Sequence, residues 1–105
     1  MPQGALPISI ETFQGGSTKL NLPASTVSLV KASAGRIMQI NINTVLSAAL
    51  TVYDSSTTAG TAASNIVYVS AATAAAGTIL VLDFPVVNGI VVGLAGTGAA
   101  SVSYL

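Results

Sequence analysis

Cysteine and histidine are both absent from this 105-residue sequence, and charged residues make up only 6% of it. Without cysteine the chain has no thiol nucleophile and no disulfide, and without histidine it has no imidazole acid or base. The same two absences remove the usual ligands of zinc, haem and iron–sulfur sites. The composition therefore predicts a protein that is not an enzyme, has no cofactor and works through its surface.

Charge of either sign is scarce, because three Lys or Arg residues balance three Asp or Glu residues. Three scattered basic residues are too few for the phosphate contacts of nucleic-acid binding, so we expect no nucleic-acid partner. An ordinary domain is about a quarter charged, and a chain without that charged coat tends to associate. The sequence thus predicts a homo-oligomer and leaves a dimer and a trimer both open. The charged residues are Glu11, Lys19, Lys31, Arg36, Asp54 and Asp83.

The stretch from Phe84 to Leu105 carries no charge, but proline, asparagine and several glycines interrupt it. A membrane-spanning helix needs about 20 mostly apolar residues, and glycine and serine at this density disfavour any helix. We therefore expect no membrane span. The N-terminal residues show no basic segment followed by an apolar one, so we also expect no secretory signal.

Valine, isoleucine and threonine are abundant, and no window has a sustained helical stripe of apolar residues. This pattern predicts an all-β single domain over residues 1–105, a β-sandwich of jelly-roll or immunoglobulin-like type with about eight short antiparallel strands. Pro85 should end a strand at Phe84, because proline cannot donate a ladder hydrogen bond. The expected strands are Leu6–Phe13, Lys19–Leu22, Thr26–Ala32, Arg36–Leu46, Ala49–Asp54, Asn65–Ser70, Thr78–Phe84, Gly89–Leu94 and Ala100–Tyr104.

Alternation is clearest in the segment 36–44, where apolar and polar residues take turns. Such a strand has one face in the core and one in water. The segments 78–84 and 88–94 are apolar on both faces, which predicts cover from outside the sandwich by another subunit or another protein. The residues expected to be mostly buried are Met38, Ile40, Ile42, Val52, Leu80, Leu82 and Phe84.

Two stretches of small residues are candidates for contact with a partner. The segment 1–7 is a possible extended arm, and the segment 55–64 contains only Ser, Thr, Ala and Gly. The simplest interpretation of the second is a flexible loop, and the alternative is an arm that orders against a neighbour. One helical turn is possible at Ala71–Ala76. The candidate contact residues are Met1, Pro2, Gln3, Gly4, Ala5, Leu6, Ser55, Ser56, Thr57 and Thr58.

No constellation of residues predicts a catalytic or metal site. Carboxylate catalysis needs two acids held close together, and only Glu11, Asp54 and Asp83 are present. We expect these acids to serve in turns or in an ion pair with Arg36 or a lysine. Calcium ligation stays open without a recognisable motif, and the glycines at 96–98 indicate a hairpin turn. No convergent polar set predicts a small-molecule substrate.

From Ser33 onward, short strand-and-turn motifs follow one another in a distinctive order: AGRI at 34–37, LTVYD at 50–54, LDFP at 82–85, NGIVV at 88–92, GTG at 96–98 and VSY at 102–104. This order resembles small virion proteins of tailed bacteriophages, of the capsid-decoration or cement type. The resemblance implies a β-sandwich that binds as an oligomer to the major capsid protein and stabilises the head. It also implies assembly in the host bacterial cytoplasm and a final location in the virion.

Three alternatives stay open at this point. Similar sandwiches occur in head fibres and tail tips, which would change the position within the virion. A secreted adhesin-like β-sandwich would also be poor in charge, but it should carry a signal sequence. A small ligand-binding β-barrel would place a few convergent polar groups in a pocket.

Overall fold

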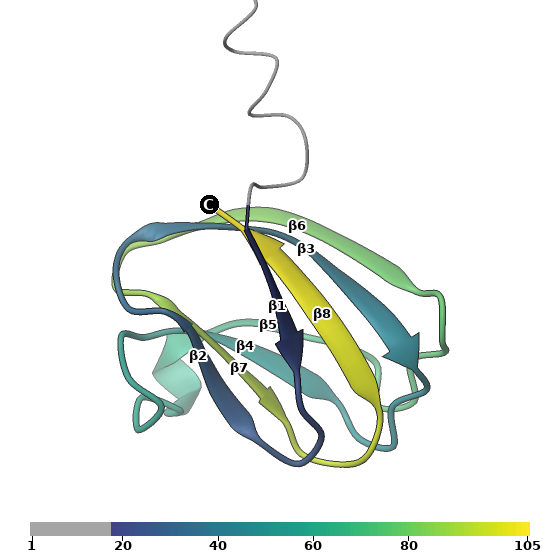
Figure 1. Ribbon diagram of the computed structural model, residues 1–105. Helices are drawn as coiled ribbons and strands as arrows, with labels where there is room; N and C mark the ends of the chain where they lie inside the picture. The colour runs from purple at the N-terminus through teal and green to yellow at the C-terminus, as the bar shows by residue number, and fades with distance from the viewer. Residues whose placement is uncertain (1–17) are drawn as a thin grey trace, which may run out of the picture.

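The computed structural model describes residues 18–105, which form eight antiparallel strands in two sheets (Figure 1). The expected strand Leu6–Phe13 and the expected arm at 1–7 lie outside the described residues. The all-β sandwich predicted from the sequence is confirmed. The strands are β1 (Thr18–Leu22), β2 (Val27–Lys31), β3 (Gly35–Thr44), β4 (Leu50–Asp54), β5 (Ile66–Val69), β6 (Ile79–Val86), β7 (Ile90–Leu94) and β8 (Ala99–Tyr104).

The strands pair in a nested order, in which β1 pairs with β8, β2 with β7, β3 with β6 and β4 with β5. The first sheet has the order β1-β8-β3-β6 and the second has the order β2-β7-β4-β5. An immunoglobulin domain instead pairs its first two strands within one sheet. The nested order is that of a jelly roll: successive strands alternate between the two four-stranded sheets except at β4 and β5, which pair with each other in the second sheet.

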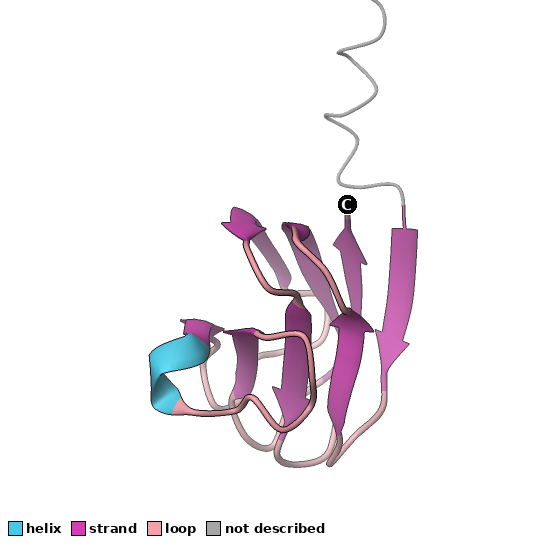
Figure 2. Cartoon of the chain, turned by 90° about the vertical axis from the view of Figure 1, so that its left-hand side faces the viewer, coloured by secondary structure: helices cyan, strands magenta, loops and turns pink. Residues whose placement is uncertain are grey.

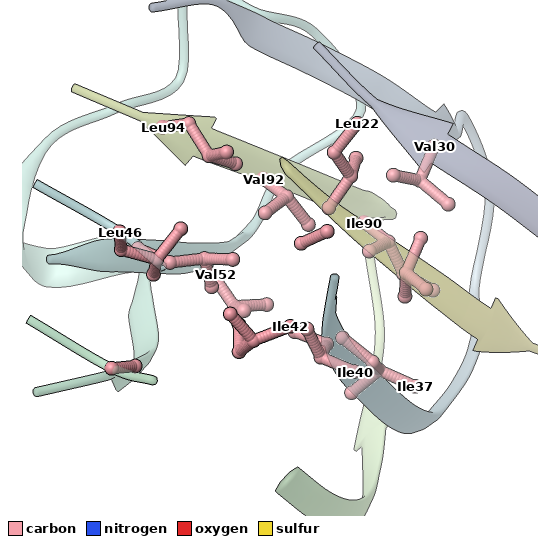
Figure 3. Close-up of a cluster of buried hydrophobic side chains, with 14 of the residues drawn as sticks. Leu22, Val30, Ile37, Ile40, Ile42, Leu46, Val52, Ile90, Val92 and Leu94 are labelled. Atoms are coloured by element: carbon pink, nitrogen blue, oxygen red, sulfur yellow. The ribbon is translucent and has the colours of Figure 1, made fainter. Parts of the chain in front are cut away.

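The core lies between the two sheets and is entirely aliphatic at its centre (Figure 3). Strands β3 and β7 supply three buried residues each, more than any other strand, because successive side chains of a strand point to opposite faces. Three of the residues expected in the core, Ile40, Ile42 and Val52, are fully buried as predicted. The fully buried side chains of the central cluster are Ile37, Ile40, Ile42, Leu50, Val52, Ile90, Val92 and Val102.

An irregularity in β3 overturns one burial prediction. Ile37 pairs with Tyr104 of β8 and Gln39 pairs with Ser103, so Met38 is an extra residue in the β3 strand. The extra residue shifts the alternation by one position. Ile37 therefore enters the core, and Met38 is only half-buried.

The edge strand β6 departs further from expectation. It continues through Pro85 to Val86, because the missing N–H of a proline does no harm where a strand has no second neighbour. The prediction that Phe84 is buried is wrong: its side chain is 47% exposed. Leu80 and Leu82 are half-buried, since a strand at the edge of a sheet has only one flank covered.

The connections hold almost no helix. The helical turn that the sequence left possible at Ala71–Ala76 does not form: that segment consists of turns, from which Ala74 enters the core. A short 3-10 helix stands instead at Ala63–Asn65, beside the second sheet (Figure 2). Within residues 18–105 there is no helix of the length and apolarity needed to cross a membrane.

Candidate interaction surface

The outer face of the first sheet is polar over three of its four strands. One row of paired residues across this sheet points into the core: Leu20, Val102, Ile40 and Leu80. Because successive side chains of a strand point to opposite faces, the rows on either side of it point outward. Those outward rows consist of Lys19, Ser103, Gln39 and Val81, and of Asn21, Ser101, Asn41 and Ile79. Only the β6 residues at the end of each row are apolar, so most of this face suits contact with water.

The outer face of the second sheet has the opposite character. Its two rows run across all four strands and contain no charged residue. Antiparallel sheets usually keep one face polar, and a sheet that is apolar on both sides is typical of burial on both sides. We call this surface the apolar face. It consists of Leu29, Val91, Tyr53 and Ile66, and of Val27, Gly93, Thr51 and Val69.

The side chains of the apolar face already pack against one another. Val91 is 0% exposed although it lies outside the central core cluster, because it is flanked in the ladder by Leu29 and Tyr53. A Cβ built on Gly93 would lie 3.5 Å from Val27 Cγ2 and 3.7 Å from Tyr53 Cε1. Around this packed centre the four aliphatic side chains of the edge strands stay exposed, namely Val27, Leu29, Ile66 and Val69.

The outward apolar residues expected in the segment 78–94 divide into two groups. Ile79 and Val81 are exposed at 59% and 71%, in agreement with the sequence. Val91 is covered by its own chain, so it needs no partner to hide it. The exposed residues of β2 and β5 were missed, because their alternation identifies an outer face only once the pairing of β2 with β7 and of β5 with β4 is known.

Asp54 ends β4 and fastens the turn before β7. Its Oδ1 accepts hydrogen bonds from the N–H groups of Asn88 (2.8 Å) and Gly89 (3.3 Å), and its Oδ2 accepts one from Val87 (3.1 Å). Partial burial acts to raise the pKa of this carboxyl, but the three backbone donors hold the pKa below its ordinary value. Asp54 thus has a structural role in a turn, as expected.

The segment 55–58 was expected to be a contact site, and its residues differ in exposure. Ser55 is buried, and its Oγ donates to the carbonyl oxygen of Thr57 (2.8 Å) and accepts from the Thr57 N–H (3.2 Å). Ser56, Thr57 and Thr58 are exposed. The loop is further tied together by the Asn65 amide, which donates to the carbonyl oxygen of Gly60 (3.1 Å). A role of the exposed residues in partner contact stays a prediction, and Met1–Leu6 lie outside the described residues.

Arg36 and Asp83 form the ion pair that the sequence allowed for. The guanidinium Nε lies 2.5 Å from Asp83 Oδ1, and Nη2 donates to the Asp83 carbonyl oxygen at 3.1 Å. Asp83 has a left-handed backbone with φ +46°, at the point where β6 has one more residue than β3. Asp83 therefore belongs to a β-bulge.

Within residues 18–105 no cluster of acidic side chains is suited to hold a metal ion.

Comparison with known protein families, curated protein sequences and solved structures finds no match to this chain.

Proposed function

We propose that this protein is a non-enzymatic structural component of a tailed-bacteriophage virion that decorates the capsid. In this role it binds the lattice of the major capsid protein as a homo-oligomer and stabilises the head after assembly in the host cytoplasm. The resemblance of the motifs from Ser33 onward supports the virion assignment, and the jelly roll is an architecture that viral capsid proteins use.

The observation that carries the proposal is the apolar face of the second sheet. Eight positions on four strands present no charge to the outside, whereas the first sheet presents lysine, asparagine, glutamine and serine. In a monomer surrounded by water, nothing requires the outer face of one sheet to lack charge while the outer face of the other is polar. The face is uncharged across all four strands and has exposed aliphatic side chains on both of its edge strands, and apolar surface of this kind marks sites of protein association.

The scarcity of charge also suits a permanent assembly. Interfaces that never open resemble a protein core that has been divided in two, with few charged groups. An oligomer that touches several capsid subunits at once gains affinity from effective concentration, so each single contact needs little area. Binding that depends on apolar contact should also depend only weakly on salt.

The test compares Leu29→Lys with Asn21→Lys in binding to particles. Both changes place a lysine on the outer face of an edge strand, but Leu29 lies on the apolar face and Asn21 lies on the polar face of the first sheet. Particles lacking the protein are incubated with each variant and heated, and release of DNA is followed by a dye. The expected result is that Asn21→Lys binds and raises the release temperature as the wild type does, whereas Leu29→Lys does neither.

Circular dichroism confirms first that both variants are folded. Full binding and protection by a folded Leu29→Lys variant would contradict the use of the apolar face. Absence of the protein from purified virions would contradict the proposal as a whole. Density for the chain at a head fibre or a tail tip in a reconstruction would move it to that part of the virion.

A further inference from the structure

The free edge of β6 is the longest strand edge in the described part of the chain. The sheet edges are β1, β6, β2 and β5, and β6, with eight residues, is the longest of them. It lies at the outer side of the first sheet in Figure 1, and among residues 18–105 no strand pairs with its outer edge. An open edge of this kind is a template for another strand.

The hydrogen bonds of β3 identify which groups of β6 are free. The N–H of Ile42 donates to the carbonyl oxygen of Thr78 (2.8 Å), so position 78 turns its backbone toward β3. Hydrogen-bonded and non-hydrogen-bonded pairs alternate along an antiparallel ladder. Leu80, opposite Ile40, therefore also faces β3, and the N–H and C=O groups of Ile79 and Val81 point to the free edge.

Only half of β6 is protected against pairing. Natural edge strands are blocked by charge, proline or a bulge, and here Asp83 supplies charge and bulge while Pro85 lacks a donor. The segment from Ile79 to Leu82 has none of these features, and its two edge-facing residues are 59% and 71% exposed. The open part of the edge is thus short, regular, uncharged and apolar.

We infer that this segment pairs with the same segment of a second copy of the chain, antiparallel about a two-fold axis that passes beside Leu80. In this register Ile79 of each copy lies opposite Val81 of the other. These are the residues whose backbone groups are free, so each pair exchanges both of its N–H···O=C hydrogen bonds. A register shifted by two residues would instead bring Asp83 of one copy opposite Ile79 of the other.

A second copy fits this edge better than a partner of other chemistry. The pairing is self-complementary, as a two-fold interface requires, and no charge on Ile79–Leu82 is brought opposite its own copy. The outward side chains of Ile79 and Val81 from both copies meet on the outer face of the joined sheet, where each is now exposed. The first sheets of two copies thereby become one continuous eight-stranded sheet, given four strands in each.

This inference rests on the self-association within the proposed function and names its contact. It is tested in purified protein without particles, so its failure is distinguishable from failure of the capsid role. The absence of native cysteine makes any introduced thiol the only one in the chain.

The experiment mixes the variants Ile79→Cys and Val81→Cys under mild oxidation and separates the products on a non-reducing gel. Directly opposite residues of a hydrogen-bonded pair have Cα atoms about 5.5 Å apart, within the range for a disulfide. The two copies of Ile79, or the two copies of Val81, are diagonal neighbours in this register, about 7–8 Å apart, and this distance disfavours a disulfide between them. The mixture should therefore give severalfold more cross-linked dimer than either variant alone, and Val45→Cys, exposed outside the strands, serves as the control.

A second variant addresses the backbone directly. Val81→Pro removes an N–H that points away from β3, so the ladder within the chain should survive, whereas the bond to the second copy is lost. Sedimentation should show the dimer reduced at least tenfold in affinity, with an unchanged melting temperature in dilute protein. Equal cross-linking in the mixture and in the single variants, or an undiminished Val81→Pro dimer, would overturn the inference.

Discussion

Replacing Ile40 with alanine should lower the free energy of unfolding by about 3–4 kcal/mol. Ile40 is fully buried and lies between Val102 of β8 and Leu80 of β6. The change deletes carbon groups worth about 0.8 kcal/mol each, or about 2–3 kcal/mol in all. A cavity term adds to this loss, because ladder hydrogen bonds on both sides of β3 keep the strands from closing the gap.

The measurement is equilibrium unfolding in urea followed by far-UV circular dichroism. Protein concentration is held constant across the series, because self-association would stabilise the folded state by mass action. Val87→Ala is the control, since that side chain is 75% exposed and should change stability by less than about 0.5 kcal/mol. Leu82→Ala should fall between them at about 1–2 kcal/mol, below the cost of about 2–5 kcal/mol for a fully buried leucine. A loss under about 1 kcal/mol for Ile40→Ala would refute the placement of β3 at the centre of the core.

Three further predictions follow from the turns and the bulge. Because the pKa of Asp54 is lowered in the folded state, its stabilising effect should be present above the unfolded value of 3.8 and lost as the pH falls through the lower folded value. Asp54→Asn should therefore be less stable than the wild type in urea at pH 7, and the difference should shrink as the pH falls below 3.8, so a difference that stays constant from pH 7 to pH 2 would contradict this. Gly89→Ala should cost more than about 2 kcal/mol in thermal unfolding, because its Cβ would collide with two backbone carbonyl oxygens, and an unchanged melting temperature would disprove that contact. Arg36→Ala removes an exposed ion pair and should lower the free energy of unfolding in urea by less than about 1 kcal/mol. A measured loss clearly above that value would contradict the prediction.

The order and position of the described strands could be predicted from the sequence because alternation and turn residues are local signals. β3 was expected at Arg36–Leu46 and runs over Gly35–Thr44, and β7 was expected at Gly89–Leu94 and runs over Ile90–Leu94. The alternation of β3 could not place Met38 correctly, since the extra residue exists only relative to the β8 strand. Pro85 was misjudged because the position of β6 at the edge of a sheet is a property of the whole fold.

Only part of the candidate surface could be predicted from the sequence, because the rest depends on which strands pair in the whole fold. The exposure of Ile79 and Val81 followed from the apolar residues on both faces of their segment. The apolar face depends on residues from four strands that meet only through pairings distant in sequence, such as Leu29 with Val91. No local sequence pattern predicts such a row of residues. The choice between a jelly-roll and an immunoglobulin-like strand order depends on the same distant pairings.

The nested pairing has a consequence for how the chain is made. The pair β4 and β5 is close in sequence, whereas β1 must find β8 at the opposite end of the described chain, with Thr18 beside Tyr104. Ordering the intervening chain before such a distant contact forms is entropically costly, so proteins rich in distant pairings fold slowly. The first sheet also lacks an interior strand until β8 leaves the ribosome, since β8 separates β1 from β3. Completion of the first sheet therefore has to wait until β8 has been synthesised and has left the ribosome, and a ribosome stalled before residue 99 should hold a nascent chain that is still open to protease.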